Sequence, residues 1–138
     1  MTKQSSAGYQ ERAHTADWAL EVWAPNMIDL LQQAARGMYA LMHAQLQGDF
    51  RETYRFEIAA PDRETLLVTF LAELLYFTQR DDVGFDRFNL SQAGERVIVE
   101  VEGAPLESIA KEIKAVTYHN LVVSETGRGL ETTVVFDV

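Results

Sequence analysis

The spacing of apolar residues alternates along the chain between that of a strand and that of a helix, and the order of these stretches limits the folds that the chain can adopt. Apolar residues recur at every second position over residues 18–23, which predicts a strand, and then at helical spacing over residues 27–44. The same change follows between residues 53–60 and a second helical stretch, which begins after Asp62, a residue type that caps helices. The chain is therefore predicted to begin as strand, helix, strand, helix.

From residue 85 onwards the pattern changes to that of strands. Candidate strands cover residues 85–90, 97–102, a part of 113–123, and 130–138, with a short helix expected over 106–113. Short connections between consecutive strands favour antiparallel pairing. We therefore predict an α+β fold, a two-layer sandwich in which two main helices pack on one face of a mixed, largely antiparallel sheet.

The length of the chain fits one domain. Its 138 residues can bury a single core, and we place that domain at residues 13–138, after a polar stretch, 1–12, expected to be a flexible tail. The absence of cysteine excludes disulfides and thiolate metal sites. No apolar run approaches the roughly 20 residues that span a membrane, and the first residues do not resemble a signal peptide. The expected location is therefore cytoplasmic.

The charge balance narrows the classes of partner. Acidic residues outnumber basic ones by 21 to 12, which gives a formal net charge of −9. A protein that binds nucleic acid by itself neutralises phosphates with clustered lysine and arginine, whereas the basic residues are scattered along this chain. Autonomous binding of RNA or DNA is therefore not expected, and neither is association with a membrane. A cationic protein partner or a metal cation suits this charge better.

Two aspartates near opposite ends of the chain are candidate metal ligands. Asp17 immediately precedes the first predicted strand, and Asp137 lies one position before Val138. Together with an oxygen of Val138, the two carboxylates could supply three or more of the oxygen ligands that hard cations such as Ca²⁺ or Mg²⁺ prefer. Taken singly, Asp17 is better explained as a turn or cap residue, and Asp137 as a solvated strand end. The sequence leaves open whether the two segments meet.

Three further residues have both a functional and a structural explanation. His14 and His119 are possible zinc ligands, but a structural zinc site usually takes four ligands with Cys or His dominant. We therefore expect them to have supporting roles in ordering the Asp17 turn and the later strand or loop. Lys114 lies among apolar residues, either as a snorkelling side chain or as a cation held near the acidic residues or aimed at a partner's phosphate. The sequence contains no nucleophile elbow, phosphate-binding glycine loop or zinc-protease motif, so we do not expect an enzyme.

Four short motifs, in order along the chain, resemble those of the archease family. They are His-Thr-Ala-Asp at residues 14–17, Leu-Ala-Glu-Leu-Leu-Tyr at 71–76, Ile-Lys-Ala-Val-Thr-Tyr-His at 113–119 and Val-Phe-Asp-Val at 135–138. The resemblance extends from about Arg12 to Val138. It departs from the family pattern after Asp17, where Trp18-Ala19 stands in place of a common isoleucine-glycine pair.

The resemblance implies a function that is exerted through a protein partner. Archeases are small acidic proteins that activate the GTP-dependent RtcB-type RNA ligase of tRNA splicing and RNA repair, by promoting guanylylation and multiple turnover of the ligase. By position, the resemblance implies a divalent-metal site at Asp17, Asp137 and Val138, with Ca²⁺ expected ahead of Mg²⁺ or Mn²⁺, and a functionally important Lys114. Two alternatives stay open: a stand-alone metal-dependent phosphoester hydrolase and a chaperone-like protein-binding module.

Overall fold

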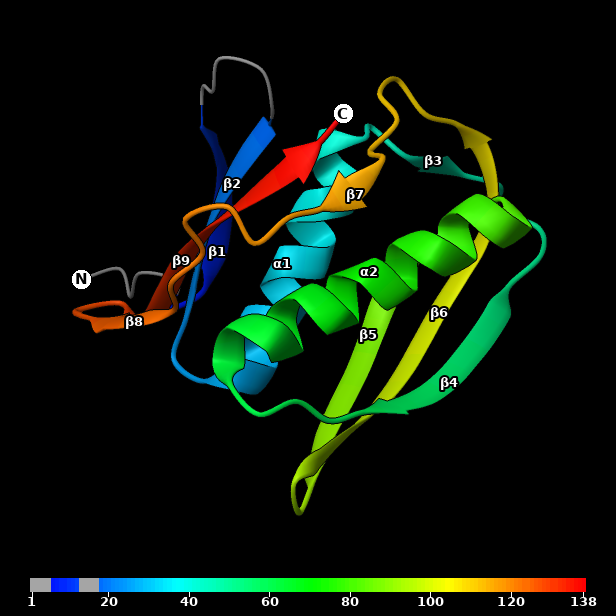
Figure 1. Ribbon diagram of the computed structural model, residues 1–138. Coiled ribbons are helices and arrows are strands. Elements are labelled where there is room, and N and C mark those ends of the chain that lie inside the picture. The colour runs from blue at the N-terminus through cyan, green and yellow to red at the C-terminus, as the bar shows by residue number, and fades with distance from the viewer. Residues whose placement is uncertain (1–5, 13–17) are drawn as a thin grey trace, which may run out of the picture.

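Two antiparallel sheets and two helices make up the computed structural model, which describes residues 6–12 and 18–138 (Figure 1). The elements follow one another as β1 (Gly8–Arg12), β2 (Trp18–Ala24), α1 (Met27–Leu41), β3 (Gln45–Leu46), β4 (Glu52–Ile58), α2 (Arg63–Asp81), β5 (Val83–Ala93), β6 (Arg96–Ser108), β7 (Ala115–Val116), β8 (Ser124–Thr126) and β9 (Gly129–Asp137). The predicted α+β class with two main helices is confirmed.

Each sheet is built around one central strand. In the first sheet the order is β1-β2-β9-β7, and β8 also pairs with β9. In the second sheet β6 lies between β4 and β5, and the last residues of β6 pair with the short strand β3. Every pair of strands within the described ranges is antiparallel. Short connections account for the antiparallel pairing of the consecutive strands β1 and β2, β5 and β6, and β8 and β9.

Capping residues set where the two helices begin. The side chain of Asn26 accepts a hydrogen bond from the backbone N–H of Asp29 at 2.9 Å, and that of Asp62 accepts from Thr65 at 2.7 Å. Each side chain thus satisfies one of the backbone donors that the first turn of a helix leaves without an intrahelical partner. At its other end α2 is followed by Asp82, which has a left-handed backbone with φ of 56° and turns the chain directly into β5.

The helices and both sheets share one hydrophobic core. Helix α1 contacts β2 of the first sheet and β5 of the second, while α2 contacts β5 and β7. The largest fully buried side chains are Phe70 of α2, Phe85 of β5 and Phe136 of β9. The predicted apolar stripe of the second helix is confirmed, because it is buried throughout: Leu67, Phe70, Leu71, Leu74 and Leu75. Neither helix is apolar enough over its described length to cross a membrane.

Three details differ from the sequence-based expectations. The strands divide between two sheets instead of joining one mixed sheet, because β9 pairs with β2 and β6 pairs with β4 and β5. Residues Gly8–Arg12, which fall within the expected tail, form β1 and pair along the whole length of β2. Residues Leu106–Ser108 extend β6 by pairing with β3, so the short helix expected from residue 106 is wrong.

Candidate functional site

The candidate site lies at one end of the first sheet, where the last residues of β9 run between β2 and β7 (Figure 1). On one side Phe136 of β9 is the register partner of Trp18, the first residue of β2. On the other side Asp137 is the register partner of Ala115, the first residue of β7. Three segments that are far apart in the sequence therefore meet at this end of the sheet.

Backbone hydrogen bonds fix residues 114–117 against the end of β9. The N–H of Lys114 donates to the carbonyl oxygen of Asp137 at 2.7 Å, and the N–H of Thr117 donates to that of Val135 at 3.1 Å. The Thr117 hydroxyl donates to the same Val135 oxygen at 2.9 Å. Lys114, which directly precedes β7, and Asp137, the last residue of β9, are two of the residues singled out from the sequence, and this bond holds them side by side.

Helix α2 holds the same segment from its other side. The amide nitrogen of Gln79 donates to the carbonyl oxygen of Ile113 at 3.2 Å, and it lies 3.5 Å from that of Lys114. Near the start of the helix, a carboxylate oxygen of Glu64 accepts from the backbone N–H of Val123 at 2.7 Å. Sequence reasoning missed both anchors, because each joins a helix side chain to a backbone atom that is distant in the sequence.

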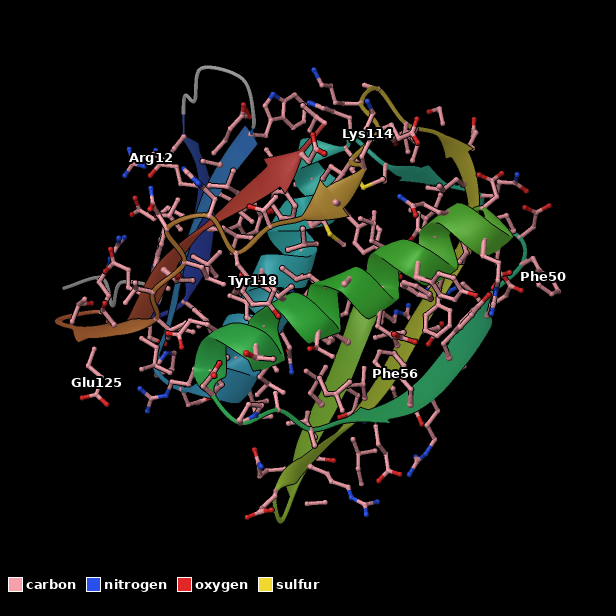
Figure 2. All side chains as sticks on the ribbon, in the orientation of Figure 1. Arg12, Phe50, Phe56, Lys114, Tyr118 and Glu125 are labelled. Carbon is pink, nitrogen blue, oxygen red and sulfur yellow. The ribbon has the colours of Figure 1, made fainter. Side chains whose placement is uncertain are left out.

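The side chains that face solvent at this end are chemically suited to a charged ligand. Asp137 is exposed, and no donor among the described residues contacts its carboxylate. Lys114 is also exposed and lies beside the end of β9 (Figure 2). Val138 is half-buried and packs against the core. The arrangement presents one carboxylate from the last residue of β9 and one ammonium group from the residue that precedes β7.

Lys111 adds a second cation near the start of β2. Its ammonium nitrogen lies 4.8 Å from the centroid of the Trp18 ring, which is cation–π range. The structure places Lys111 between β6 and β7, where a short helix was expected over residues 106–113, and its backbone N–H donates to the carbonyl oxygen of Met42 at 3.3 Å. Because Asp17 is covalently attached to Trp18, Lys111 belongs to the surroundings of the candidate site.

The described part of the site does not by itself make a metal centre. Within residues 6–12 and 18–138 there is no group of three or more His, Asp or Glu side chains that could hold a metal ion. Asp17 and His14 lie outside the described residues. The described donors are oxygens, which fits the hard-cation chemistry inferred for Asp137 and Val138. The predicted ligand set therefore stays a prediction.

His119 belongs to the turn that follows the Lys114 segment. Its backbone N–H donates to the Thr117 hydroxyl at 3.3 Å, and its Nε2 atom lies 3.3 Å from the side-chain nitrogen of Asn120. Asn120 has a positive φ of 51°, a conformation that asparagine tolerates better than most residues. These contacts place His119 in a turn close to Thr117 and Asn120, and the supporting role expected for it stays a prediction.

The outer face of the first sheet carries charges that neutralise one another. Hydrogen bonds from Arg128 and Arg12 hold the pKa of Glu21 below its ordinary value, and Arg128 also lowers that of Glu131. The Arg128 guanidinium carbon lies 4.0 Å from the centroid of the Trp23 ring. Each charge of this network has a partner. The network therefore adds side-chain contacts between β1, β2 and β9 and does not supply a ligand site.

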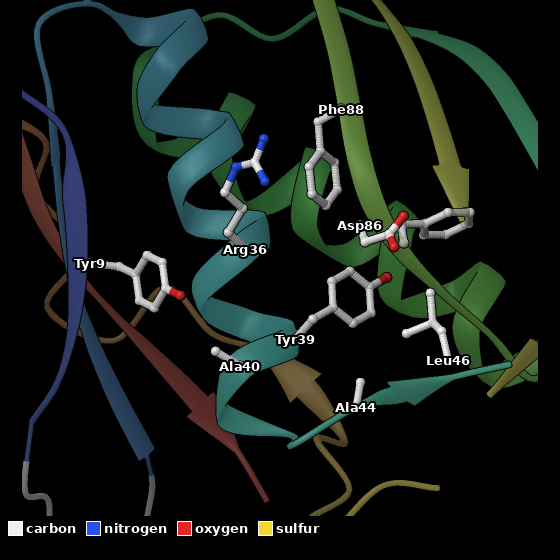
Figure 3. Close-up of a pocket in the computed structure, with 9 residues that line it drawn as sticks. Tyr9, Arg36, Tyr39, Ala40, Ala44, Leu46, Asp86 and Phe88 are labelled. Carbon is white, nitrogen blue, oxygen red and sulfur yellow. The ribbon is translucent and has the colours of Figure 1, made fainter. Parts of the chain in front are cut away.

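A separate pocket of about 270 Å³ opens between the two sheets, over helix α1 (Figure 3). Tyr9 of β1, Arg36 and Tyr39 of α1, and Phe85 and Phe88 of β5 line it. The sequence analysis did not find it, because its residues share no motif and come together only through the packing of β1 and β5 on either side of the helix.

The fold and the end-of-sheet site define a small acidic α+β protein whose described candidate groups are Lys114, which precedes β7, and Asp137, at the end of β9. The chain belongs to the archease family, because residues 9–138 match the sequence model of the Archease protein family (MTH1598/TM1083). It is similar to the archease of Methanosarcina barkeri, with 30% identity over 145 aligned residues that cover 94% of this chain and 95% of the relative. The archease of Methanopyrus kandleri is 32% identical, with 87% and 92% covered.

Two solved structures share the fold. The crystal structure of an archease, a possible chaperone, from Thermotoga maritima aligns with a TM-score of 0.71 and 24% identity, covering 91% of this chain and 93% of the other. The solution structure of Methanobacterium thermoautotrophicum protein 1598 aligns with a TM-score of 0.70 and 21% identity, covering 95% and 99%. At these identities the likeness supports the fold alone.

Proposed function

We propose that this chain is an accessory activator of a GTP-dependent RtcB-type RNA ligase in tRNA splicing and RNA repair. In this proposal it promotes guanylylation and multiple turnover of the ligase and does not catalyse a reaction alone. The partner and the activity follow from membership of the archease family. A net charge of −9 fits a protein that acts through an RNA-binding partner rather than on RNA directly.

One structural observation carries the proposal: the backbone hydrogen bond of 2.7 Å that joins Lys114 to Asp137. It brings together the lysine and the penultimate aspartate that the resemblance marks as functional. Trp18 on the next strand is the register partner of Phe136, and it directly follows Asp17 in the sequence. In this proposal the first, third and fourth motifs contribute to one surface.

The proposed roles follow from the chemistry of these groups. The carboxylates of Asp17 and Asp137, with an oxygen of Val138, would hold a divalent cation, with Ca²⁺ preferred and Mg²⁺ or Mn²⁺ as alternatives. When bound, such an ion supplies a concentrated positive charge for a phosphate or carboxylate. The ammonium group of Lys114 adds a positive charge beside the ligand carboxylates, suited to a phosphate in the partner's nucleotide site.

The test is multiple-turnover RNA ligation by a cognate ligase, with and without the full chain. We expect the chain to raise both the fraction of guanylylated ligase and the number of ligations per ligase. Asp137→Ala and Lys114→Ala should each lower this stimulation at least tenfold, with unchanged far-ultraviolet circular dichroism. Matched controls are Asp49→Ala and Arg55→Ala, which remove exposed charges away from β7 and β9.

Three outcomes would overturn the proposal. Full stimulation by Asp137→Ala would remove the role of the carboxylate. Hydrolysis of phosphoesters by the chain alone with Mg²⁺ or Mn²⁺ would favour a stand-alone hydrolase. Binding of client proteins without any effect on ligation, and with no change in Lys114→Ala, would favour a chaperone-like module.

A further inference from the structure

The pocket over α1 contains an arginine that differs from every other arginine in the chain. Of the nine arginines, eight form at least one ion pair with an aspartate or glutamate. Arg36 forms none with any described residue. Its guanidinium carbon instead lies 5.3 Å from the centroid of the Phe88 ring. Among residues 6–12 and 18–138, Arg36 is therefore a positive charge at a pocket without an acidic partner, in a chain whose net charge is −9.

The acidic residue that lines the same pocket is already neutralised. Asp86 accepts hydrogen bonds from two nitrogens of Arg51, at 2.6 and 3.2 Å. These bonds, with one from Arg51 to Glu102, raise the pKa of Arg51 above its ordinary value. Because a bidentate pair satisfies the Asp86 carboxylate, Asp86 does not cancel the charge of Arg36.

Aromatic side chains form the walls around Arg36 (Figure 3). Tyr39 is buried, with its hydroxyl 2.8 Å from that of Thr78, so this wall is fixed in place. Tyr9 is 38% exposed and faces the pocket from the opposite sheet. The lack of a side chain at Gly37 lets the Tyr9 ring approach helix α1, since a Cβ atom at residue 37 would lie 3.0 Å from a ring carbon of Tyr9. The pocket is thus shaped by packing between the sheets.

The Arg36 guanidinium still has donors to offer. At 5.3 Å from the centroid of the Phe88 ring its attraction to the ring is electrostatic and uses none of its N–H groups, and a carboxylate or phosphate can accept hydrogen bonds from two of them. The pocket volume of about 270 Å³ is slightly below the roughly 300–1,000 Å³ of sites for drug-sized molecules. An occupant would therefore be small.

We propose that this pocket binds a small planar organic anion, an aromatic ring that carries one carboxylate or phosphate. The ring packs among Tyr9, Tyr39 and Phe88, and the anionic group accepts hydrogen bonds from Arg36. The site is separate from the sheet end that carries Lys114 and Asp137, and the inference does not depend on the proposed ligase partner.

Titration of the ¹⁵N-labelled full chain, monitored through amide chemical shifts, tests whether a ligand needs both an aromatic ring and a negative charge to bind. The probes are indole-3-acetate, its neutral amide indole-3-acetamide, and acetate, which lacks the ring. We expect indole-3-acetate to shift the amides of residues 36–40 and 85–88. It should bind about tenfold more tightly than indole-3-acetamide, the difference of one charge-assisted hydrogen bond, and at least about tenfold more tightly than acetate, which buries no ring.

Variants separate the role of Arg36 from general surface charge. Arg36→Gln should weaken binding of indole-3-acetate about tenfold and leave binding of indole-3-acetamide unchanged, whereas Arg55→Gln, an exposed arginine of β4, should change neither. Equal binding of the acid and the amide, shifts at other residues, or unaltered affinity in Arg36→Gln would each overturn the proposal. Amide spectra of the variants without ligand report whether the fold is retained.

Discussion

The backbone N–H of Lys114 donates to the carbonyl oxygen of Asp137, so two residues that are 23 positions apart in the sequence have coupled backbones. Their side chains are exposed, but their main chains are tied to buried neighbours, Ile113 and Phe136. The candidate functional groups therefore face solvent from backbone segments that are hydrogen-bonded to each other and flanked by buried residues. Substitutions that weaken the backbone hydrogen bonds of Lys114 and Asp137 should alter function even when they leave both side chains in place.

Substitution of Gln79 tests whether the position of the backbone around Lys114 matters for function. Its amide donates to the carbonyl oxygen of Ile113 at 3.2 Å, and such a bond contributes about 1 kcal/mol net. Gln79→Ala should therefore raise hydrogen exchange at the Lys114 amide roughly fivefold and lower stimulation of the ligase. Both effects can be measured on the same protein sample, by exchange mass spectrometry or NMR and by the ligation assay.

Gln92→Ala is the matched control for Gln79. Gln92 makes the same type of bond, from its side-chain nitrogen to the carbonyl oxygen of Gly94 at 2.8 Å, in the exposed β5–β6 hairpin. We expect it to leave both Lys114 exchange and ligation unchanged. If Gln79→Ala behaves like Gln92→Ala, α2 does not position Lys114.

Gly103→Ala should be among the most damaging small substitutions in the chain. A Cβ atom at this position of β6 would lie 1.8 Å from the carbonyl oxygen of Gly84 on β5. The obstacle is backbone, so the two strands would have to separate. We expect a loss of at least about 3 kcal/mol in the free energy of unfolding, measured by denaturant titration. Gly48→Ala, where nothing lies within 4 Å, should change it by less than about 1 kcal/mol; similar losses in both variants would contradict the steric explanation.

Asp81 makes part of the stability depend on pH. Hydrogen bonds from Arg80, and from the Tyr54 hydroxyl at 2.6 Å, lower the pKa of Asp81 to about 2 in the folded chain. A carboxyl group with a lowered folded-state pKa stabilises the fold above its unfolded value of about 3.9, and this contribution is lost as pH falls toward 2. Asp81→Asn should therefore reduce the fall in thermal midpoint between pH 4 and pH 2. Asp49→Asn is the control, and an equal fall in Asp81→Asn and the unaltered chain would refute the linkage.

The predictable parts of the fold were those with local signals. Hydrophobic spacing and caps located both helices, and Asn26 and Asp62 cap them as expected. Strand β1 gave no such signal, because four of its five residues are exposed and its one bulky apolar side chain is that of Tyr9. Its position depends on pairing with β2, which is a tertiary effect that a period-based argument does not detect.

The residues of the candidate site that belong to short motifs could be singled out from the sequence. Lys114 and Asp137 were singled out from the sequence and lie side by side, whereas Gln79 and Glu64 act through hydrogen bonds to backbone atoms that are 34 and 59 positions away. The division of the strands into two sheets was equally hidden, because alternation predicts a strand but not its neighbour. Long-range pairing is the information that one sequence did not supply.

Binding of Ca²⁺ would distinguish Asp137 from ordinary surface carboxylates. If Asp137 is a ligand, Ca²⁺ at about 100 times its dissociation constant should stabilise the full chain by about 2.7 kcal/mol, which raises the thermal midpoint by roughly 10 °C for a domain of this size. Asp137→Asn should lose most of this rise, because it removes one anionic oxygen ligand. Asp49→Asn should keep it, since any non-specific effect of Ca²⁺ on an acidic surface would be the same in both variants. Chelator should reverse the rise, and Mg²⁺ and Mn²⁺ in parallel titrations rank the alternatives. Equal stabilisation of both variants would exclude Asp137 from the site even if the unaltered chain binds Ca²⁺.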